Sequence, residues 1–73
     1  MNITYYEEVN EFGVWIMHFI SDEVEIGVMF RTYHPTISFE VYRAEHLRKA
    51  GEWNSRRVHS KEEAIKWLNN ENI

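Results

Sequence analysis

The chain contains no cysteine, and this absence excludes two common ways of stabilising a small domain. Without thiols there can be neither a disulfide nor a zinc site with thiolate ligands. The sequence has only three glycines, each of which fits a turn, a bulge or a close-packing position, and none belongs to a phosphate-binding loop. No run approaches the roughly 20 apolar residues of a membrane span. Residues 1–14 lack the basic and apolar regions of a signal peptide, which predicts a cytoplasmic protein.

The chain is also short. Its 73 residues predict one domain over 1–73, with a single core and no linker. A chain of this size buries a marginal amount of apolar surface, so good packing, a ligand or a partner subunit must contribute to its stability. Self-association is therefore one hypothesis that the length itself raises.

Charge is distributed unevenly along the sequence, although the net value is only -4. Residues 1–42 carry seven acidic side chains against one arginine, whereas residues 43–73 carry seven lysines and arginines against five glutamates. Such asymmetry can steer an encounter without naming the partner. The overall pI of about 5.5 is too low for a dedicated nucleic-acid binder.

Alternating and β-branched patterns predict an α+β fold: a four- to five-stranded antiparallel meander with one C-terminal amphipathic helix packed on one face. Strands are expected over residues 3–9, 14–20, 23–32 and 37–43. Residues 10–13 predict a three-residue hairpin loop with a bulge at Gly13, which pairs Val9 with Trp15 and Tyr5 with Phe19. Turns at residues 21–22 and 33–36 follow, and the second of them pairs Phe30 with Phe39.

These registers divide the side chains between two faces of the sheet. The predicted core face carries Ile3, Tyr5, Val9, Trp15, Met17, Phe19, Val24, Ile26, Val28, Phe30, Ile37, Phe39 and Val41. The second face is predicted to carry Tyr6, Val14, Ile16, His18, Ile20, Glu25, Met29, Arg31, Glu40 and Tyr42. A slip of one residue at the turn of residues 21–22 would exchange the faces of the second strand.

Residues 44–55 allow two structures. They can form a short helix that Gly51 stops, or the fourth strand can continue to about Leu47 and turn into a fifth strand that ends near His59. The hairpin is favoured because residues 56–59 are expected to form a strand, and this strand needs an extended segment to pair with. Further on, Ser60 and Glu63 form a capping box, which predicts a helix over about residues 61–70.

The last strand and helix carry one family resemblance. The stretch SRRVHSKEEAIKWL resembles the end of the small three-stranded DNA-binding domains at the N-termini of tyrosine integrases, in which a strand runs into a helix rich in lysine and glutamate. The resemblance covers about a fifth of the chain. The acidic first half departs from that family, and no functional residue is transferred from it.

The second sheet face is the leading candidate for an interface, because contiguous exposed apolar surface usually marks one. The candidate interface residues are Val14, Ile16, Ile20, Met29 and Tyr42. The alternative is internal cover by Leu47, Trp53 or the final Ile73. Glu8, Glu23, Glu25 and Glu40 are expected to form an acidic rim, which would select a basic partner or prevent aggregation.

A basic and aromatic stretch supports a second hypothesis. Arginine beside an aromatic side chain suits phosphate contact and base stacking. The candidate nucleic-acid contacts are Arg43, Arg48, Lys49, Trp53, Arg56 and Arg57. The alternative is a solvated edge whose arginines pair with Glu45 and Glu52.

The histidines raise the question of chemistry, since imidazole binds metals and titrates near neutrality. His18, His34, His46 and His59 have no known ligand spacing, so we predict no catalytic, cofactor or metal site and no enzyme. The hypothesis from sequence is a non-catalytic interaction module, a regulator, inhibitor or accessory subunit of phage or mobile-element type. It would bind a protein partner, or a second copy as a homodimer, through the second sheet face.

Overall fold

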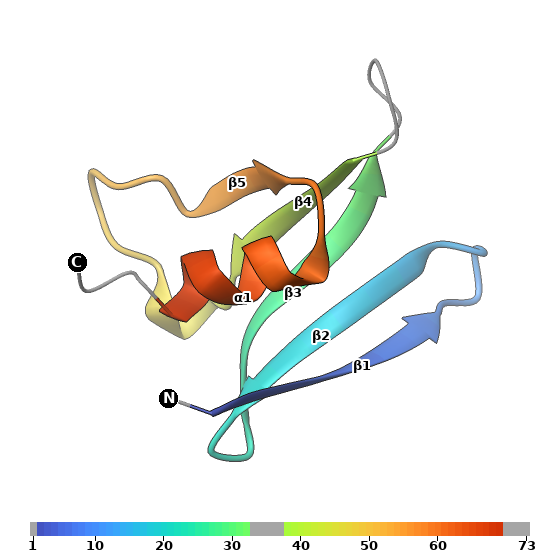
Figure 1. Cartoon of the computed structure of the whole chain (residues 1–73), viewed down its shortest axis with the longest axis horizontal. Helices are drawn as coiled ribbons and strands as arrows, with labels where there is room; N and C mark the ends of the chain where they lie inside the picture. The colour runs from blue at the N-terminus through green and yellow to red at the C-terminus, as the bar shows by residue number, and fades with distance from the viewer. Residues whose placement is uncertain (1, 33–37, 70–73) are drawn as a thin grey trace.

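The structure is a computed structural model that describes residues 2–32 and 38–69. Its strands are β1 (Ile3–Val9), β2 (Trp15–Ser21), β3 (Val24–Thr32), β4 (Ser38–Arg43) and β5 (Ser55–Val58). They form one antiparallel sheet in sequence order. Helix α1 (Lys61–Asn69) lies on one face and contacts β3 and β5 (Figure 1). This arrangement confirms the predicted α+β fold.

The first hairpin has the predicted register. Val9 pairs with Trp15 and Tyr5 with Phe19. The Asn10 side-chain oxygen accepts hydrogen bonds from the backbone N–H groups of Phe12 and Val14, and Gly13 has a φ of 79°. Glycine adopts this left-handed conformation without steric cost, which is why the loop can close in so few residues.

The second hairpin turns through Asp22 and Glu23, one residue later than predicted. Ser21 pairs with Val24, so these two residues form the whole loop. Both have positive φ, 53° for Asp22 and 65° for Glu23. That is the geometry of a type I′ turn, which favours Asn-Gly because most side chains resist left-handed backbone.

Replacing Glu23 with glycine should therefore stabilise the chain. Glycine removes the steric strain of the left-handed backbone, but it also makes the unfolded chain more flexible, which opposes folding. The net gain in the free energy of unfolding should be about 0.5–1 kcal/mol. Urea unfolding followed by circular dichroism measures the difference. Glu23→Ala removes the same carboxylate but keeps a Cβ, so a comparable gain from the alanine variant would contradict the explanation.

A bulge in β3 changes which side chains face the helix. Phe19 pairs with Gly27 and Ile20 with Glu25, which leaves Ile26 without a partner residue on β2. A bulge residue reverses the alternation that follows it. Met29 therefore lies in the core, 1 % exposed, while Val28 and Phe30 turn to the opposite face. The prediction that Val28 and Phe30 face the core is wrong for this reason.

The pairing beyond this bulge also differs from the prediction. Phe30 pairs with Glu40, and Phe39 pairs with Arg31, so the predicted pair of Phe30 with Phe39 is wrong by one residue. Arg31 consequently lies on the helix side, where its guanidinium is 5.2 Å from the ring centroid of Trp15. The predicted turn at residues 33–36 and the core position of Ile37 lie outside the described residues.

Residues 44–55 combine parts of both predicted structures. β4 ends at Arg43, as predicted for the strand itself, and does not continue to Leu47, because Glu45–Leu47 form one turn of 3₁₀ helix. The chain then returns, the Arg43 N–H donates to the Asn54 carbonyl, and β5 pairs with β4. The predicted fifth strand is present, but the connection to it is a loop that begins with a short helix instead of a tight hairpin.

Helix α1 begins where the capping box placed it. The Ser60 hydroxyl accepts a hydrogen bond from the Glu63 N–H, while the Glu63 carboxylate accepts one from the His59 N–H. The apolar side of the helix packs on the sheet and completes the core. The buried hydrophobic residues are Met17, Phe19, Ile26, Met29, Val41, Val58, Ala64 and Leu68.

Candidate functional site

The face of the sheet opposite α1 is the candidate site, and we call it the open face. Its members follow from the register, because directly paired residues of antiparallel strands point to the same side. Of the predicted second-face residues, seven are on it: Tyr6, Ile16, His18, Ile20, Glu25, Glu40 and Tyr42. Glu8, Val28, Phe30 and Arg57 share this face.

The structure keeps part of the predicted interface and replaces part of it. Ile16, Ile20 and Tyr42 lie on the open face and are half-buried. Val14 precedes β2 and is 43 % exposed. Met29 is in the core under α1, so its placement on this face is wrong, and the β3 bulge is the reason.

Val28 and Phe30 are the open-face residues that the sequence pattern missed. Their alternation with Glu23 and Glu25 is the usual signature of core residues. A signal against that interpretation was Gly27, since glycine inside a strand often marks a bulge or a close backbone approach. Phe30 is half-buried and packs edge-on against Tyr42, with ring centroids 5.8 Å apart.

Internal cover by the two described candidates does not occur. Leu47 packs against the core on the helix side of the sheet. Trp53 is 85 % exposed in the loop before β5. Ile73, the third candidate, lies outside the described residues. Neither Leu47 nor Trp53 therefore shields the apolar centre of the open face, which consists of Ile16, Ile20, Val28, Phe30 and Tyr42.

His18 lies beside this apolar centre, between two carboxylates. Its Nδ1 contacts the Glu25 carboxylate, and its Nε2 is 2.6 Å from Oε1 of Glu8. The ring stacks on Tyr6, with centroids 4.6 Å apart and planes inclined by 11°. Burial lowers the pKa of His18, but hydrogen bonds to Glu25 and Glu8, together with their charges, outweigh burial and raise the pKa overall.

The raised pKa makes the stabilising effect of His18 depend on pH. A folded-state pKa above the unfolded value favours folding while the imidazole is protonated, and this contribution disappears as pH rises through the folded pKa. His18→Gln should therefore cost about 1 kcal/mol at about pH 6, the size of two partly exposed ion pairs. The cost should be smaller at about pH 9, because less of the wild-type imidazole is protonated there.

Urea unfolding of both proteins at the two pH values measures this difference. The matched control is His59→Gln, because the His59 side chain is 75 % exposed, although it lies 3.6 Å from Glu63. An exposed substitution of this kind should change stability by less than about 0.5 kcal/mol. Equal losses at both pH values for His18→Gln would show that the charge of His18 is irrelevant.

Acidic side chains border the apolar centre, as expected for three of the four rim residues. Glu8, Glu25 and Glu40 are on the open face, whereas Glu23 is in the β2–β3 turn. Burial and the nearby Glu40 raise the pKa of Tyr42, so its phenol stays protonated at neutral pH. Arg57 is opposite Glu40 on β5 and is the basic residue of this border.

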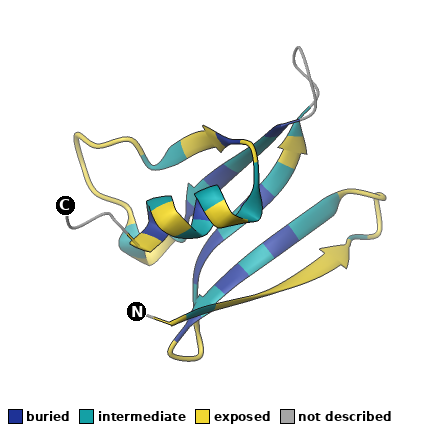
Figure 2. Ribbon diagram, in the orientation of Figure 1, coloured by how far each residue is buried: buried dark blue, intermediate teal, exposed yellow. Residues whose placement is uncertain are grey.

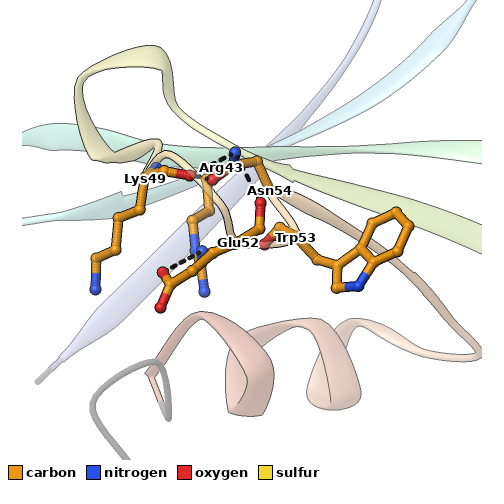
Figure 3. A network of polar contacts seen from close by, with 5 residues as sticks. All are labelled: Arg43, Lys49, Glu52, Trp53 and Asn54. Carbon is orange, nitrogen blue, oxygen red and sulfur yellow. Dashed lines mark hydrogen bonds and ion pairs between the residues drawn. The ribbon is translucent and has the colours of Figure 1, made fainter.

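The basic stretch does not form one surface. Arg43 is 6 % exposed, its guanidinium lies 4.7 Å from the Trp67 ring centroid, and its Nη1 donates to the Trp53 carbonyl. The structure thus removes Arg43 from the surface contacts. Figure 3 shows Arg43, Lys49 and Glu52 around the loop before β5, with the Trp53 ring directed away from them.

The remaining arginines of the basic stretch point in different directions. Arg56 is opposite Val41 on the helix side, while Arg57 is opposite Glu40 on the open face. The exposed Arg48 donates from Nε to the Arg43 carbonyl over 3.4 Å. Of the predicted pairs with Glu45 and Glu52, the structure shows Arg43 with Glu52, at 3.9 Å. A nucleic-acid strand could therefore not contact all the candidates at once.

The described residues contain no group of three or more histidine, aspartate and glutamate side chains suited to a metal ion. His34 lies outside them. Within residues 2–32 and 38–69, no helix has the length and apolarity needed to cross a bilayer. Comparison of the chain with protein-family models, with curated proteins and with solved structures gives no match.

Proposed function

We propose that this chain is a non-catalytic interaction module that binds a protein partner through its open face. The observation that carries the proposal is a half-buried apolar centre on the side of the sheet away from α1, which neither Leu47 nor Trp53 covers. Phe30 and Tyr42 supply aromatic side chains to that centre, and aromatic residues are enriched at the centres of interfaces. Contiguous apolar surface that the chain itself leaves uncovered usually marks a binding site for another molecule.

The charge of the border favours a basic partner over a second copy of the same face. Glu8, Glu25 and Glu40 surround the apolar centre, and Arg57 alone has a permanent positive charge among the described residues assigned to this face. Two such faces in contact would place carboxylates near one another, which is unfavourable. A partner with an apolar centre and a rim of lysine or arginine would meet complementary charge.

Selection from a random peptide library tests this preference for apolar and basic partners. Random peptides are selected on the immobilised chain, in parallel with selection on Ile16→Asp, which introduces a charge at the apolar centre. We expect the wild type to enrich peptides that combine aromatic or aliphatic residues with lysine or arginine. Their binding should weaken with salt and fall at least tenfold on Ile16→Asp, because a buried unpaired charge costs several kcal/mol.

The matched control is Phe12→Asp, which introduces the same charge at a loop side chain that is 82 % exposed. It should bind the enriched peptides like the wild type. Equal enrichment on Ile16→Asp, or enrichment of acidic peptides, would overturn the proposal. Retardation of single- or double-stranded oligonucleotides at low salt, lost in Arg56→Ala and Arg57→Ala, would instead support nucleic-acid binding.

A further inference from the structure

The outer strand of the sheet, β1, has no lysine, proline or bulge to protect its edge, and its charged side chains are Glu7 and Glu8. Natural edge strands are often short or interrupted by lysine, proline or a bulge. β1 has seven residues, ITYYEEV, and pairs with β2 without a shift in register. Six of the seven residues are exposed, which is visible as the nearly continuous exposed ribbon of β1 in Figure 2. Tyr5, Tyr6 and Val9 are 43 %, 51 % and 65 % exposed.

The free backbone groups of this edge can be assigned from the loop that follows. The N–H of Asn10 donates to the Val14 carbonyl and so points toward the second strand. The direction of N–H and C=O alternates along an antiparallel strand. The odd-numbered residues of β1 therefore point these groups outward. They are Ile3, Tyr5, Glu7 and Val9.

We propose that β1 pairs antiparallel with β1 of a second copy of this chain, with Tyr6 on the two-fold axis. This register pairs Ile3 with the partner's Val9 and Tyr5 with the partner's Glu7. It uses every outward-pointing residue of the strand and keeps each pair on one side of the sheet. The two five-stranded sheets then form one continuous sheet, with both helices on the same side.

The same register is complementary in charge. Lys61 Nζ lies 4.5 Å from the ring centroid of Tyr5 and 2.7 Å from its hydroxyl. The partner's Glu7 stands opposite Tyr5 in this register. Its carboxylate accepts a hydrogen bond of 3.2 Å from Trp15 Nε1 of the same chain, and turning it toward Lys61 forms an ion pair that the two-fold axis repeats. On the other side of the sheet Glu8 is opposite the partner's Thr4. No two carboxylates are directly opposite, and like charges in that position are the pairs that destabilise a sheet.

This association goes beyond the proposed binding of a protein partner, because it uses the edge of the sheet and leaves the open face uncovered. Joining the edges would place two open faces side by side on one surface. A partner with repeated binding segments would then gain avidity from the second site.

Sedimentation equilibrium and light scattering of the full chain test the dimer. We expect a mass twice the 8.9 kDa of the chain at micromolar to millimolar concentration. Glu7→Lys brings an ammonium group toward the partner's Lys61, and Lys61→Glu brings a carboxylate toward the partner's Glu7. Because each variant sets like charges against each other across the edge, it should weaken the dimer at least tenfold. Glu11→Lys makes the same charge change in the loop after β1 and should leave the dimer intact.

Mixing the two variants identifies the pair as intermolecular. A Glu7→Lys chain and a Lys61→Glu chain each carry like charges internally, but they are complementary across the edge, so their mixture should form a heterodimer. Circular dichroism of each variant checks that it is folded. A monomeric wild type, dimers of both single variants, or a mixture that stays monomeric would overturn the proposal. A dimer lost in Ile16→Asp but kept in Glu7→Lys would assign association to the open face instead.

Discussion

Replacing Phe19 with alanine should destabilise the chain by about 3–5 kcal/mol, the usual cost of truncating a buried phenylalanine. Phe19 is fully buried, and its partner on β3 is Gly27, which has no side chain. The aromatic ring therefore fills space that no facing side chain could fill in its place, so the cavity would persist. Because domains of this size are stable by only several kcal/mol, the variant should be largely unfolded at 25 °C.

Urea unfolding followed by tryptophan fluorescence and circular dichroism measures the loss. Phe12→Ala is the matched control, since the Phe12 side chain is 82 % exposed and its truncation should change stability by less than about 0.5 kcal/mol. Phe19→Leu removes fewer atoms and gives a folded intermediate for the series. Similar stability of Phe19→Ala and the wild type would show that Phe19 does not support the sheet.

Local signals in the sequence were sufficient for the ends of the fold. Asn10 and Gly13 determine the first hairpin through hydrogen bonds and backbone conformation within five residues, so its register could be predicted. Ser60 and Glu63 determine the start of α1 in the same way. In both places the interacting groups are close in sequence, so the residue types alone predict the hydrogen bonds that they form.

The faces of β3 could not be predicted, because they depend on a contact between distant residues. Val24, Ile26, Val28 and Phe30 alternate as core residues do, yet the bulge at Ile26 divides them between the two faces. The bulge brings Gly27 and Met29 under α1, and its benefit arises from packing against a helix about 40 residues later in the sequence. The alternation of residues along one strand cannot predict packing against a distant helix.

The candidate site inherits this error, so its residues differ from those that the sequence predicted. Ile16, Ile20 and Tyr42 were correctly assigned to the second face, but Val28 and Phe30 join them and Met29 leaves. The exchange adds an aromatic ring to the centre of the open face. The strand order places β1 at the edge of the sheet, as the predicted meander implies.

Gly27→Ala is expected to cost about 1–3 kcal/mol, near the upper end of that range for overpacking. A Cβ at this position would lie 2.8 Å from the Tyr42 carbonyl oxygen and 3.1 Å and 3.2 Å from the two methyl groups of Leu68. The carbonyl belongs to a strand that is paired on both sides, so it cannot move without disturbing the sheet. The methyl groups can move, but only by lifting α1 from its contact.

A double-mutant cycle with Leu68→Ala separates these two causes. Leu68 is 2 % exposed, so Leu68→Ala alone should cost about 2–5 kcal/mol through the cavity it leaves. In the double variant the new Cβ occupies part of that cavity, so the loss should be smaller than the sum by about 0.5–1 kcal/mol. The clash between the new Cβ and the Tyr42 carbonyl oxygen remains in the double variant. Leu68→Ala therefore offsets only part of the cost of Gly27→Ala. Additive losses would show that the close approach of α1 does not require glycine, and complete cancellation would show that the backbone contact is harmless.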